Sequence, residues 1–488
     1  MHTIDPWVPP NMSRARATVR LLRLLALLPL PVLAATAAMP EGAAHASGFL
    51  TDQFGSDQGQ PALASAYSVY FNPAAMAGMY GSDITVDGVL AARSLDYNRT
   101  STSPADGLGD PVYTSANTGQ AHLFNVLAAP FAGFVTDFGG SKLRLGVAAY
   151  VPFGGELSWT KNPSFANSSY APGAVDGPQR WSTISASTES LYGTVALAYR
   201  LEKARIGIGA SFSAIDTTLA DVRARNADGS DDIVNPGGSV KEGRSYLNVS
   251  GVQVGAAAGI YWEATKDGAL RLGASYTSQP GFGAMRLHGT FQLYPAAPGA
   301  STAADLVQGY PDIIRFGGAW RVRPDTEIRL DGDWQRWSQF KDQCITSPGG
   351  ACPTDSSGAY SGSNNTTVKL DLPRDWNDTV KLRLGIAYWV VPETELSASF
   401  AFESAPTAKS HIDPLLYDST RLEPSVGVRH AFTKHFYASL SYTYIYVAPL
   451  TVNDSAYPNY APPSRSPSTN GSYSSQIYVF DGALSYRF

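Results

Sequence analysis

The sequence predicts an all-β protein, namely a 14-stranded antiparallel transmembrane β-barrel with an N-terminal plug in its lumen. Three observations predict this fold. Apolar and polar residues alternate with a period of two over many segments, which is the pattern of strands with two different faces. These segments number about fourteen, and most reach the roughly 9 to 11 residues of a tilted membrane-spanning strand. Short turns and long polar loops alternate between them, as in barrels that cross a membrane.

The composition favours one large, folded β architecture. The chain has 488 residues, of which 44% are hydrophobic, 16% charged and 11% aromatic. Soluble globular domains contain about 25% charged residues, so charge is scarce in this chain. A sequence this apolar and aromatic is not that of a disordered protein. The formal net charge is −5, and no cluster of Lys and Arg follows the N-terminal region. Nucleic-acid binding is therefore excluded.

The first 46 residues are organised like a secretory signal peptide. An apolar stretch over residues 24–33 leads through small residues to Ala44-His45-Ala46, an A-x-A cleavage site, so we expect cleavage before Ser47. The apolar stretch is too short for a membrane anchor, which needs about 20 apolar residues. The protein is therefore expected to be exported. The basic residues that precede the apolar stretch are Arg14, Arg16, Arg20 and Arg23.

The two cysteines predict a disulfide. Cys344 and Cys352 lie close together in a stretch rich in Ser, Gly and Pro, and an exported chain meets oxidising conditions. A metal site would need more ligands than this stretch supplies, and the histidines after residue 46 lack the spacing of metal ligands. We therefore expect a cross-link within a loop, and neither a metal nor another cofactor.

The predicted strands follow from the alternation of residue types. Between Glu327 and Gln335, for example, Ile328, Leu330 and Trp334 alternate with charged residues, so one face of the strand is apolar and the other is polar. The barrel is expected to span residues 82–488. The predicted strands begin near Ser82, Gly119, Lys142, Trp181, Lys203, Arg244, Ala269, Tyr310, Asp325, Asp375, Glu393, Tyr417, Lys434 and Ser474.

The connections between these strands form two alternating sets. Tight turns are expected at residues 139–141, 201–202, 266–268, 323–325, 391–393 and 432–434, and long loops near Thr100, Asn167, Ser230, Pro295, Ser356 and Ser466. Short turns at one end and long loops at the other are typical of bacterial outer-membrane barrels. Closure of the sheet also leaves no strand edge exposed to lipid. We therefore expect the protein in the outer membrane of a Gram-negative bacterium.

Aromatic residues gather near the ends of the predicted strands, where interfacial belts form. We interpret these residues as belt or lipid-facing side chains: Trp334, Trp337, Trp376, Tyr388, Trp389, Tyr442, Tyr444 and Tyr446. The chain ends on Phe488 after an alternating strand. This ending resembles the C-terminal signature by which the barrel-assembly machinery recognises outer-membrane barrels.

Residues 47–81 are predicted to form a plug, or hatch, inside the barrel. They alternate poorly and contain many small residues. A flexible tail would be more charged and less apolar. Asn72 precedes Pro73, and this dipeptide favours a turn that should end one element of the hatch.

Five motifs in the same order resemble those of the FadL-type family of outer-membrane transporters (OmpP1/FadL/TodX-like). Together they extend the resemblance over residues 47–488, and their order and the matching strand count make it specific. The motifs are Ser47-Gly48-Phe49 at the mature start, Asn72-Pro73-Ala74, Trp337-Ser338-Gln339-Phe340, the W-x-D-T…L-G segment over residues 374–385, and Phe402-Glu403-Ser404-Ala405-Pro406.

The resemblance implies transport of long-chain fatty acids and other hydrophobic compounds. In that family outer loops capture the ligand, a hatch blocks the barrel, and movement of the mature N-terminus opens a path. The ligand leaves sideways through a gap made by an inward kink of the third strand. By carry-over, Phe49 would lie near the binding pocket and Asn72-Pro73-Ala74 near the kink. Pro152 lies toward the outer end of the third strand, so the position of the kink is left open.

Two features do not carry over from the family. The hatch between Phe49 and Asn72 is shorter than in the family's fatty-acid transporters, so complete blockage of the lumen is not implied. The basic residues that would contact a fatty-acid carboxylate do not transfer by motif. Arg180, Arg223 and Arg225 are candidates, alongside the simpler interpretation of solvated loop charges.

The predicted function is energy-independent facilitated diffusion of a hydrophobic small molecule, most simply a long-chain fatty acid. The transporter is expected to be a monomer in contact with outer-membrane lipid and lipopolysaccharide. Uptake of aromatic hydrocarbons is the alternative substrate class. A general porin for hydrophilic solutes is a further alternative, but a plug argues against it. An enzyme is not expected, because the chain has no G-x-S-x-G motif, nor the G-x-x-x-x-G-K-[ST] motif of a nucleotide site.

Overall fold

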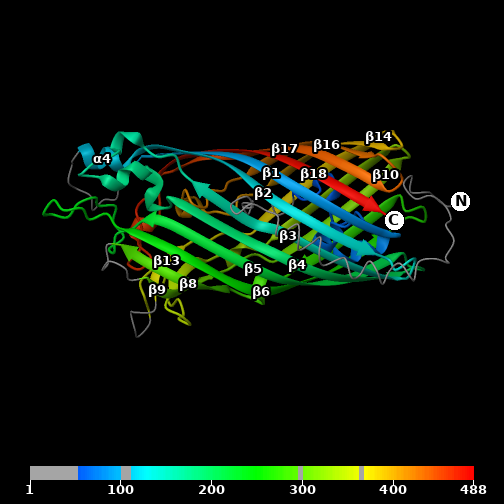
Figure 1. Cartoon of the computed structure of the whole chain (residues 1–488), viewed down its shortest axis with the longest axis horizontal. Helices are drawn as coiled ribbons and strands as arrows, with labels where there is room; N and C mark the ends of the chain where they lie inside the picture. The colour runs from blue at the N-terminus through cyan, green and yellow to red at the C-terminus, as the bar shows by residue number, and fades with distance from the viewer. Residues whose placement is uncertain (1–52, 101–110, 295–300, 362–367) are drawn as a thin grey trace.

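One antiparallel sheet closes on itself to form a barrel. The computed structural model describes residues 53–100, 111–294, 301–361 and 368–488. The first strand pairs with both the second and the last strand, which closes the sheet. Figure 1 shows the strands tilted to the long axis, with α4 at one end and the C-terminus at the other. The predicted signal peptide, residues 1–46, and Phe49 lie outside the described residues.

Fourteen strands form the barrel wall, as the sequence predicts, and two further hairpins extend it at the end with long loops. The wall strands are β1(Ser82–Arg99), β2(Gly119–Thr136), β3(Leu143–Ser158), β4(Ser185–Leu201), β5(Ile206–Ala224), β6(Arg244–Glu263), β7(Leu270–Thr277), β10(Ile313–Arg323), β11(Thr326–Gln335), β14(Thr379–Val391), β15(Thr394–Glu403), β16(Arg421–Ala431), β17(Phe436–Val452) and β18(Gly471–Arg487). The added hairpins are β8(Met285–Tyr294) with β9(Thr302–Gln308), and β12(Asp342–Thr346) with β13(Val368–Pro373).

The helices are short and lie in the loops or inside the barrel. No helix in the described part of the chain is long and apolar enough to cross a membrane. The α-helices are α3(Ser68–Phe71) and α4(Pro111–Asn117). The 3₁₀-helices are η2(Ser56–Gln58), η3(Pro73–Gly78), η4(Pro163–Phe165), η5(Pro172–Asp176), η6(Pro178–Trp181), η7(Pro280–Phe282), η8(Trp337–Gln339), η9(Lys409–His411) and η10(Tyr457–Asn459).

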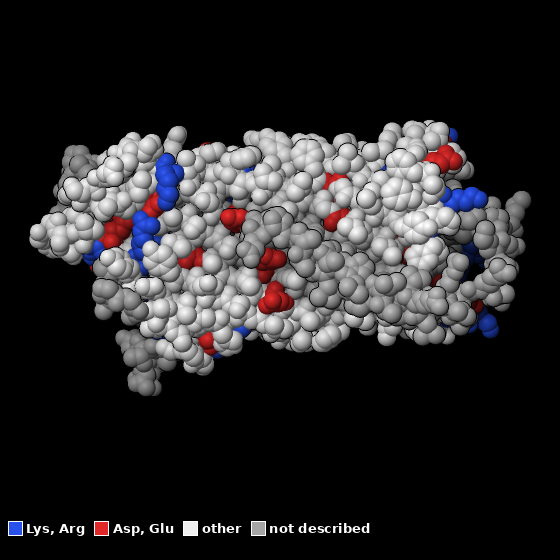
Figure 2. Space-filling model, viewed as in Figure 1, with Lys and Arg blue, Asp and Glu red and all other residues white. Residues whose placement is uncertain are grey.

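The wall strands present an apolar face outward. On β6, Val252 and Ile260 are 73% and 48% exposed, whereas the inward-facing Val249 and Tyr261 are buried. Figure 2 shows Lys and Arg side chains gathered toward the two ends of the molecule on the face in view. Between these ends the face in view is mostly uncharged, with a few Asp and Glu side chains, and a largely apolar outer band is what contact with lipid requires.

Residues 53–81, the luminal segment, lie inside the barrel. The side chain of Asn72 donates a hydrogen bond of 3.0 Å to the carbonyl of Ile260 on β6. Toward another part of the wall, Ser399 of β15 donates one of 2.8 Å to Asp57. Contacts with strands so far apart in the sheet require the segment to cross the lumen.

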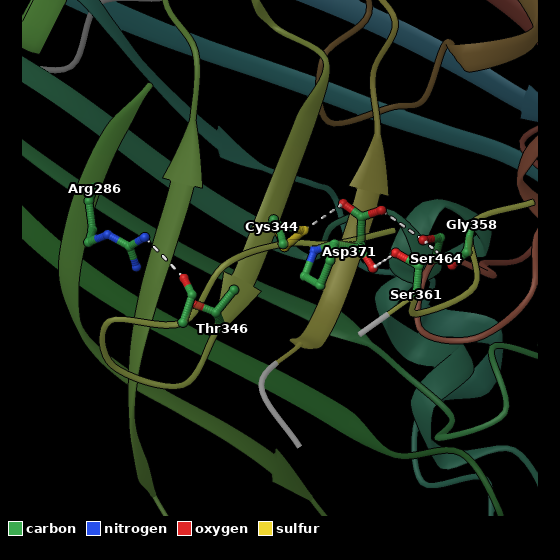
Figure 3. Close-up of a disulfide and its surroundings, with 10 residues drawn as sticks. Arg286, Cys344, Thr346, Gly358, Ser361, Asp371 and Ser464 are labelled. Carbon is green, nitrogen blue, oxygen red and sulfur yellow. Dashed lines mark hydrogen bonds between the residues drawn. A yellow bond between two sulfur atoms is a disulfide. The ribbon is translucent and has the colours of Figure 1, made fainter. Parts of the chain in front are cut away.

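A disulfide joins Cys344 of β12 to Cys352. The loop that it closes packs against the added hairpins, where the backbone amide of Gly349 donates 2.8 Å to Asp305 of β9. Figure 3 shows Asp371 of β13 beside this cross-link, accepting a hydrogen bond of 2.7 Å from Ser464. Asp371 therefore ties the β12/β13 hairpin to a loop that precedes β18.

Candidate functional site

At one level of the barrel, four neighbouring strands of the wall are interrupted by irregular segments. The strand pairs β7/β8, β9/β10, β11/β12 and β13/β14 are separated by residues 278–284, 309–312, 336–341 and 374–378. The register aligns these breaks, because Gln308 pairs with both Met285 and Gln343, and Ile313 pairs with both Thr277 and Gln335. The wall therefore lacks a regular ladder at this level, between the strands β7, β10, β11 and β14 and the two added hairpins.

The breaks place four aromatic side chains, Tyr310, Trp337, Phe340 and Trp376, inside the barrel, where all are buried. The ring centroids of Trp337 and Trp376 lie 4.8 Å apart, and those of Phe340 and Trp376 lie 5.0 Å apart. The interpretation of Trp337 and Trp376 as belt or lipid-facing residues is therefore wrong. Outside a regular ladder, strict alternation of side chains no longer holds, so the rings of Trp337 and Trp376 can turn to the lumen. The interpretation is also wrong for Trp389, which is buried on the inward face of β14, where the Arg321 guanidinium lies 3.8 Å from its ring centroid.

These rings line a large apolar cavity, the outer cavity, with an empty volume of about 1230 Å³. A mostly apolar lining with a few polar groups is typical of pockets that bind small organic molecules. The apolar lining consists of Phe153, Leu157, Leu219, Leu247, Leu306, Tyr310, Trp337, Phe340, Ile345, Leu372, Trp376, Leu415 and Leu416.

The outer cavity also has a polar part. Arg421 of β16 lines it and donates hydrogen bonds of 3.0 Å to both Glu403 and Asp418. Arg93 of β1 lines the cavity too, and its side chain is buried. Buried guanidinium groups form strong, often bidentate hydrogen bonds with carboxylates. The cavity is thus amphipathic, with an apolar body and a polar part that contains three arginines, namely Arg93, Arg421 and Arg223 of β5.

The third strand, β3, contains a bulge. Tyr150 pairs with Tyr192 of β4, but Phe153 pairs with Ser190, so Val151 and Pro152 face a single residue of the partner strand. Two residues opposite one is the definition of a β-bulge, and proline supplies no N–H to a ladder. Val151, Pro152 and Phe153 are all buried in succession, unlike a regular strand of the wall. A bulge bends its strand, and just after this one Phe153 lines the outer cavity inside the barrel.

The same bulge ends the pairing of β3 with β2. The ladder between them runs only from the Leu145–Thr136 pair to the Tyr150–Phe131 pair. Nearer the loops the two strands meet again, where Thr160 donates 3.0 Å to the carbonyl of His122. Between these contacts, residues 126–130 of β2 and 151–155 of β3 share no ladder among the described pairs. We call this interruption of the ladder the β2–β3 gap.

The middle of the luminal segment has a closely fitted seat on the wall. The amide of Asn72 donates 2.9 Å to the carbonyl of Pro61, and its oxygen accepts 3.1 Å from the backbone of Ala74. Glycines form the facing wall. A Cβ added to Gly209 would lie 2.6 Å from backbone atoms of Pro73 and Ala74. Only a residue without a side chain allows this close approach of two backbones.

The first part of the luminal segment is held by polar contacts. The backbone amide of Gly55 donates 2.8 Å to Asp87 of β1. From β14, Arg383 donates 2.8 Å to the carbonyl of Gly59. Phe54 adds an aromatic contact with Phe131 of β2, with centroids 5.7 Å apart. These contacts are separate from the glycine-lined seat around Asn72.

The three candidate arginines lie in different places. Arg223 of β5 lines the outer cavity and donates 2.6 Å to Asp221. Arg180 in η6 is fully buried in the loop region, where it pairs with Glu242 at 2.9 Å. Arg225 follows β5 and donates 2.8 Å to the carbonyl of Arg465. Burial, together with the nearby Arg223 charge, lowers the pKa of Arg225 to about 10. Arg180 and Arg225 do not line the outer cavity.

Sequence reasoning did not identify Arg93, Arg421 or the aromatic lining as site residues. A signal was present for Trp337 and Trp376, since both belong to family motifs. A motif residue outside a continuous strand pattern can serve a site instead of an interface belt. Nothing comparable in the sequence distinguishes Arg93 or Arg421 from other inward-facing charges of the wall.

One group in the described part of the chain has the residue types of a metal site, namely Cys344, Cys352 and Asp371. Both sulfur atoms belong to the disulfide. A thiolate is the form of cysteine that binds metal, so this group is a cross-link with a neighbouring carboxylate.

Comparisons with known proteins agree with this geometry. The family model for outer membrane protein transport proteins (OMPP1/FadL/TodX) matches residues 56–488. The crystal structure of a Pseudomonas aeruginosa FadL homologue is similar, with a TM-score of 0.70 and 17% identity over 92% of this chain and 100% of that chain. No match was found among curated protein sequences.

Two toluene transporters have the same fold. TodX of Pseudomonas putida gives a TM-score of 0.59 and 13% identity, covering 87% of this chain and 94% of its own. TbuX of Ralstonia pickettii gives a TM-score of 0.55 and 16% identity, over 92% of this chain and 100% of the TbuX chain. Because the family model spans nearly the whole barrel and luminal segment, the chain belongs to the OMPP1/FadL/TodX family, whose members transport hydrophobic molecules across the outer membrane.

Proposed function

We propose that this protein takes up long-chain fatty acids by facilitated diffusion without an energy source. The observation that carries the proposal is the amphipathic outer cavity. Its apolar body fits an acyl chain, and the guanidinium groups of Arg93 and Arg421 in its polar part fit a carboxylate. Membership of a family of hydrophobe transporters supports the same substrate class.

Burial of the acyl chain would supply most of the affinity. Each buried methylene group contributes about 0.8 kcal/mol, so about ten of them contribute on the order of 8 kcal/mol before the costs of ordering the ligand. The carboxylate contributes by pairing with arginines away from water. Since Arg421 already contacts Glu403 and Asp418, the ligand must share or replace those partners.

We further propose that the luminal segment is the hatch. In this proposal Asn72, Pro73 and Ala74 form its fixed seat, Phe49 lies near the binding pocket, and the polar contacts of Gly55 and Gly59 release first. A ligand that binds one hatch position more tightly than the other shifts the balance between them. The β2–β3 gap then serves as a lateral exit into the membrane.

Aromatic hydrocarbons are the second candidate substrates. The rings of Phe153, Tyr310, Trp337, Phe340 and Trp376 line the outer cavity, and such rings favour aromatic ligands in offset or edge-to-face contact. TodX and TbuX, which share the fold, are toluene transporters. A neutral hydrocarbon would make no use of Arg93 and Arg421.

The arginines therefore separate the two substrate classes. We would measure uptake of radiolabelled oleate and of toluene by cells that lack their own transporter. Replacing both arginines, Arg93→Gln with Arg421→Gln, should lower oleate uptake at least tenfold and leave toluene uptake within twofold. Arg323→Gln, at an exposed turn position, is the matched control. Toluene uptake without oleate uptake by the intact protein would replace the fatty-acid assignment with the hydrocarbon assignment.

A further inference from the structure

A second cavity adjoins the outer cavity. This inner cavity has an empty volume of about 460 Å³ and lies between α3 of the luminal segment and the wall. Val69 and Tyr70 line it from the luminal segment, and Ser211 and Ser213 line it from β5. Among the residues that line either cavity, only Phe153 lines both. The ring of Phe153 thus stands between the two spaces.

Phe153 fills this position tightly. It is 5% exposed, and its ring stacks on that of Tyr310 at a centroid distance of 5.0 Å and an interplanar angle of 24°. The rings of Trp337 and Tyr192 each lie 6.4 Å away. Trp337 belongs to the outer cavity and Tyr192 to the inner one. An apolar molecule cannot pass between the cavities here while this ring stays in place.

The backbone around Phe153 can move more freely than a regular strand. The residue follows Pro152 directly, on the side of the bulge where β3 has lost its ladder with β2. Its remaining ladder partner is Ser190 of β4. Gly154 and Gly155 come next and contribute no side chains that would hold the strand. A strand paired on one edge only, between a proline and two glycines, is a suitable place for a hinge.

Beyond Phe153, aromatic rings continue toward the β2–β3 gap. Tyr192 stacks on Tyr150 with centroids 5.4 Å apart, and Tyr150 stacks on Phe131 at 5.9 Å. Phe131 and Tyr150 form the last ladder pair before the β2–β3 gap. An apolar molecule that passes Phe153 would therefore meet aromatic surface up to the gap.

We propose that Phe153 is an inner gate, which sets the size of molecule that can pass from the outer cavity to the inner cavity. The inference rests on the proposed transport function, but it does not depend on which hydrophobe is carried. Rotation of this ring joins the two cavities. The size of residue 153 then controls passage, while most of the binding surface of the outer cavity comes from its other lining residues.

A labelling experiment tests the gate without any natural substrate. Both native cysteines are in the disulfide, so an introduced thiol is the single reactive one. Ser213→Cys places that thiol in the inner cavity, and Ser187→Cys places one in the outer cavity. The probe is N-phenylmaleimide, added to the purified full-length protein. With Ser213→Cys, Phe153→Ala should raise the labelling rate at least tenfold and Phe153→Trp should lower it at least fivefold.

Two controls identify the cause of a rate change. Labelling of Ser187→Cys should stay within twofold in all Phe153 variants, because the outer cavity lies before the gate. Phe291→Ala removes an equally buried ring that lines neither cavity, and it should not change the labelling of Ser213→Cys. A labelling rate of Ser213→Cys that is independent of residue 153, or that rises equally with Phe291→Ala, would overturn the proposal.

Uptake then connects the gate with transport. At saturating oleate, where a change in oleate affinity no longer limits transport, Phe153→Trp should lower the rate of oleate uptake at least fivefold. A loss of uptake that disappears at saturating oleate would assign Phe153 to the binding site instead of a gate. If the intact protein takes up neither oleate nor toluene, the proposed function fails, whereas the labelling result still decides whether residue 153 controls passage between the cavities.

Discussion

The seat of the luminal segment gives the sharpest prediction. Gly209 faces the segment from β5, and a Cβ at this position would lie 2.6 Å from the carbonyl carbon of Pro73 and from the amide nitrogen of Ala74. Both atoms belong to backbone, so neither can rotate away. Gly209→Ala must therefore push the segment from the wall or bend β5.

The magnitude follows from the cost of overpacking, which is typically about 1–3 kcal/mol for added methyl or methylene groups. If the seated position of the segment is destabilised by this amount, the equilibrium between the seated and the displaced segment shifts toward the displaced one by roughly 5- to 150-fold. A displaced segment opens the lumen to ions. We therefore expect Gly209→Ala to raise the conductance of planar bilayers that contain the protein at least fivefold.

The matched control is Gly193→Ala on the neighbouring strand β4, where an added Cβ meets no atom within 4 Å. It should conduct like the intact protein. Both variants should migrate as heat-modifiable folded barrels. Gly209→Ala with the conductance of Gly193→Ala, in a correctly inserted barrel, would refute the assignment of this contact as the seat of the hatch.

Three further predictions concern the cavity and the loops. Trp376→Ala removes an aromatic contact from the outer cavity, so oleate affinity in equilibrium dialysis should fall about tenfold; unchanged affinity would place the ligand elsewhere. Replacing Cys344 and Cys352 with serine should lower the free energy of unfolding by about 2–3 kcal/mol, and an unchanged unfolding midpoint would contradict this. Burial lowers the pKa of His411, which contacts Tyr460 at 2.7 Å, although nearby Asp375 opposes this effect. Because the folded state favours the neutral ring, the contact should weaken as pH falls below about 6.5, and amide protection factors over residues 404–420 should drop between pH 7.5 and 5.5; constant factors would contradict it.

Much of the barrel could be predicted from the sequence because a lipid-facing wall enforces alternation of side chains. Each predicted strand start lies within about four residues of an observed wall strand; Trp181, for example, precedes the start of β4 at Ser185. The added hairpins were missed. Strands β8, β9, β12 and β13 pair beyond the wall at the end with long loops, where neither face has to be apolar, so they lack the pattern that marks the other strands.

The site was less predictable because it lies where the regular ladder stops. Trp337 and Trp376 point inward only because four neighbouring strands of the wall are interrupted at the same level. The alternation of side chains does not predict which face such residues take. The sequence places Pro152 toward the outer end of the third strand but does not assign the kink to it. The bulge also ends the ladder between β3 and β2. This effect depends on how β3 pairs with both of its neighbours, and the sequence of β3 alone does not contain that information.

The most direct test of the account is whether oleate leaves through the β2–β3 gap. Deleting Pro152 removes one of the two residues that oppose a single residue of β4, which should restore a regular β3 and close the gap. In the protein that lacks Pro152, binding of oleate in the outer cavity should still quench tryptophan fluorescence. This protein should nevertheless take up radiolabelled oleate at less than about a tenth of the rate of the intact protein. Uptake at the intact rate, through a barrel whose solved structure has a continuous β2–β3 ladder, would contradict the account.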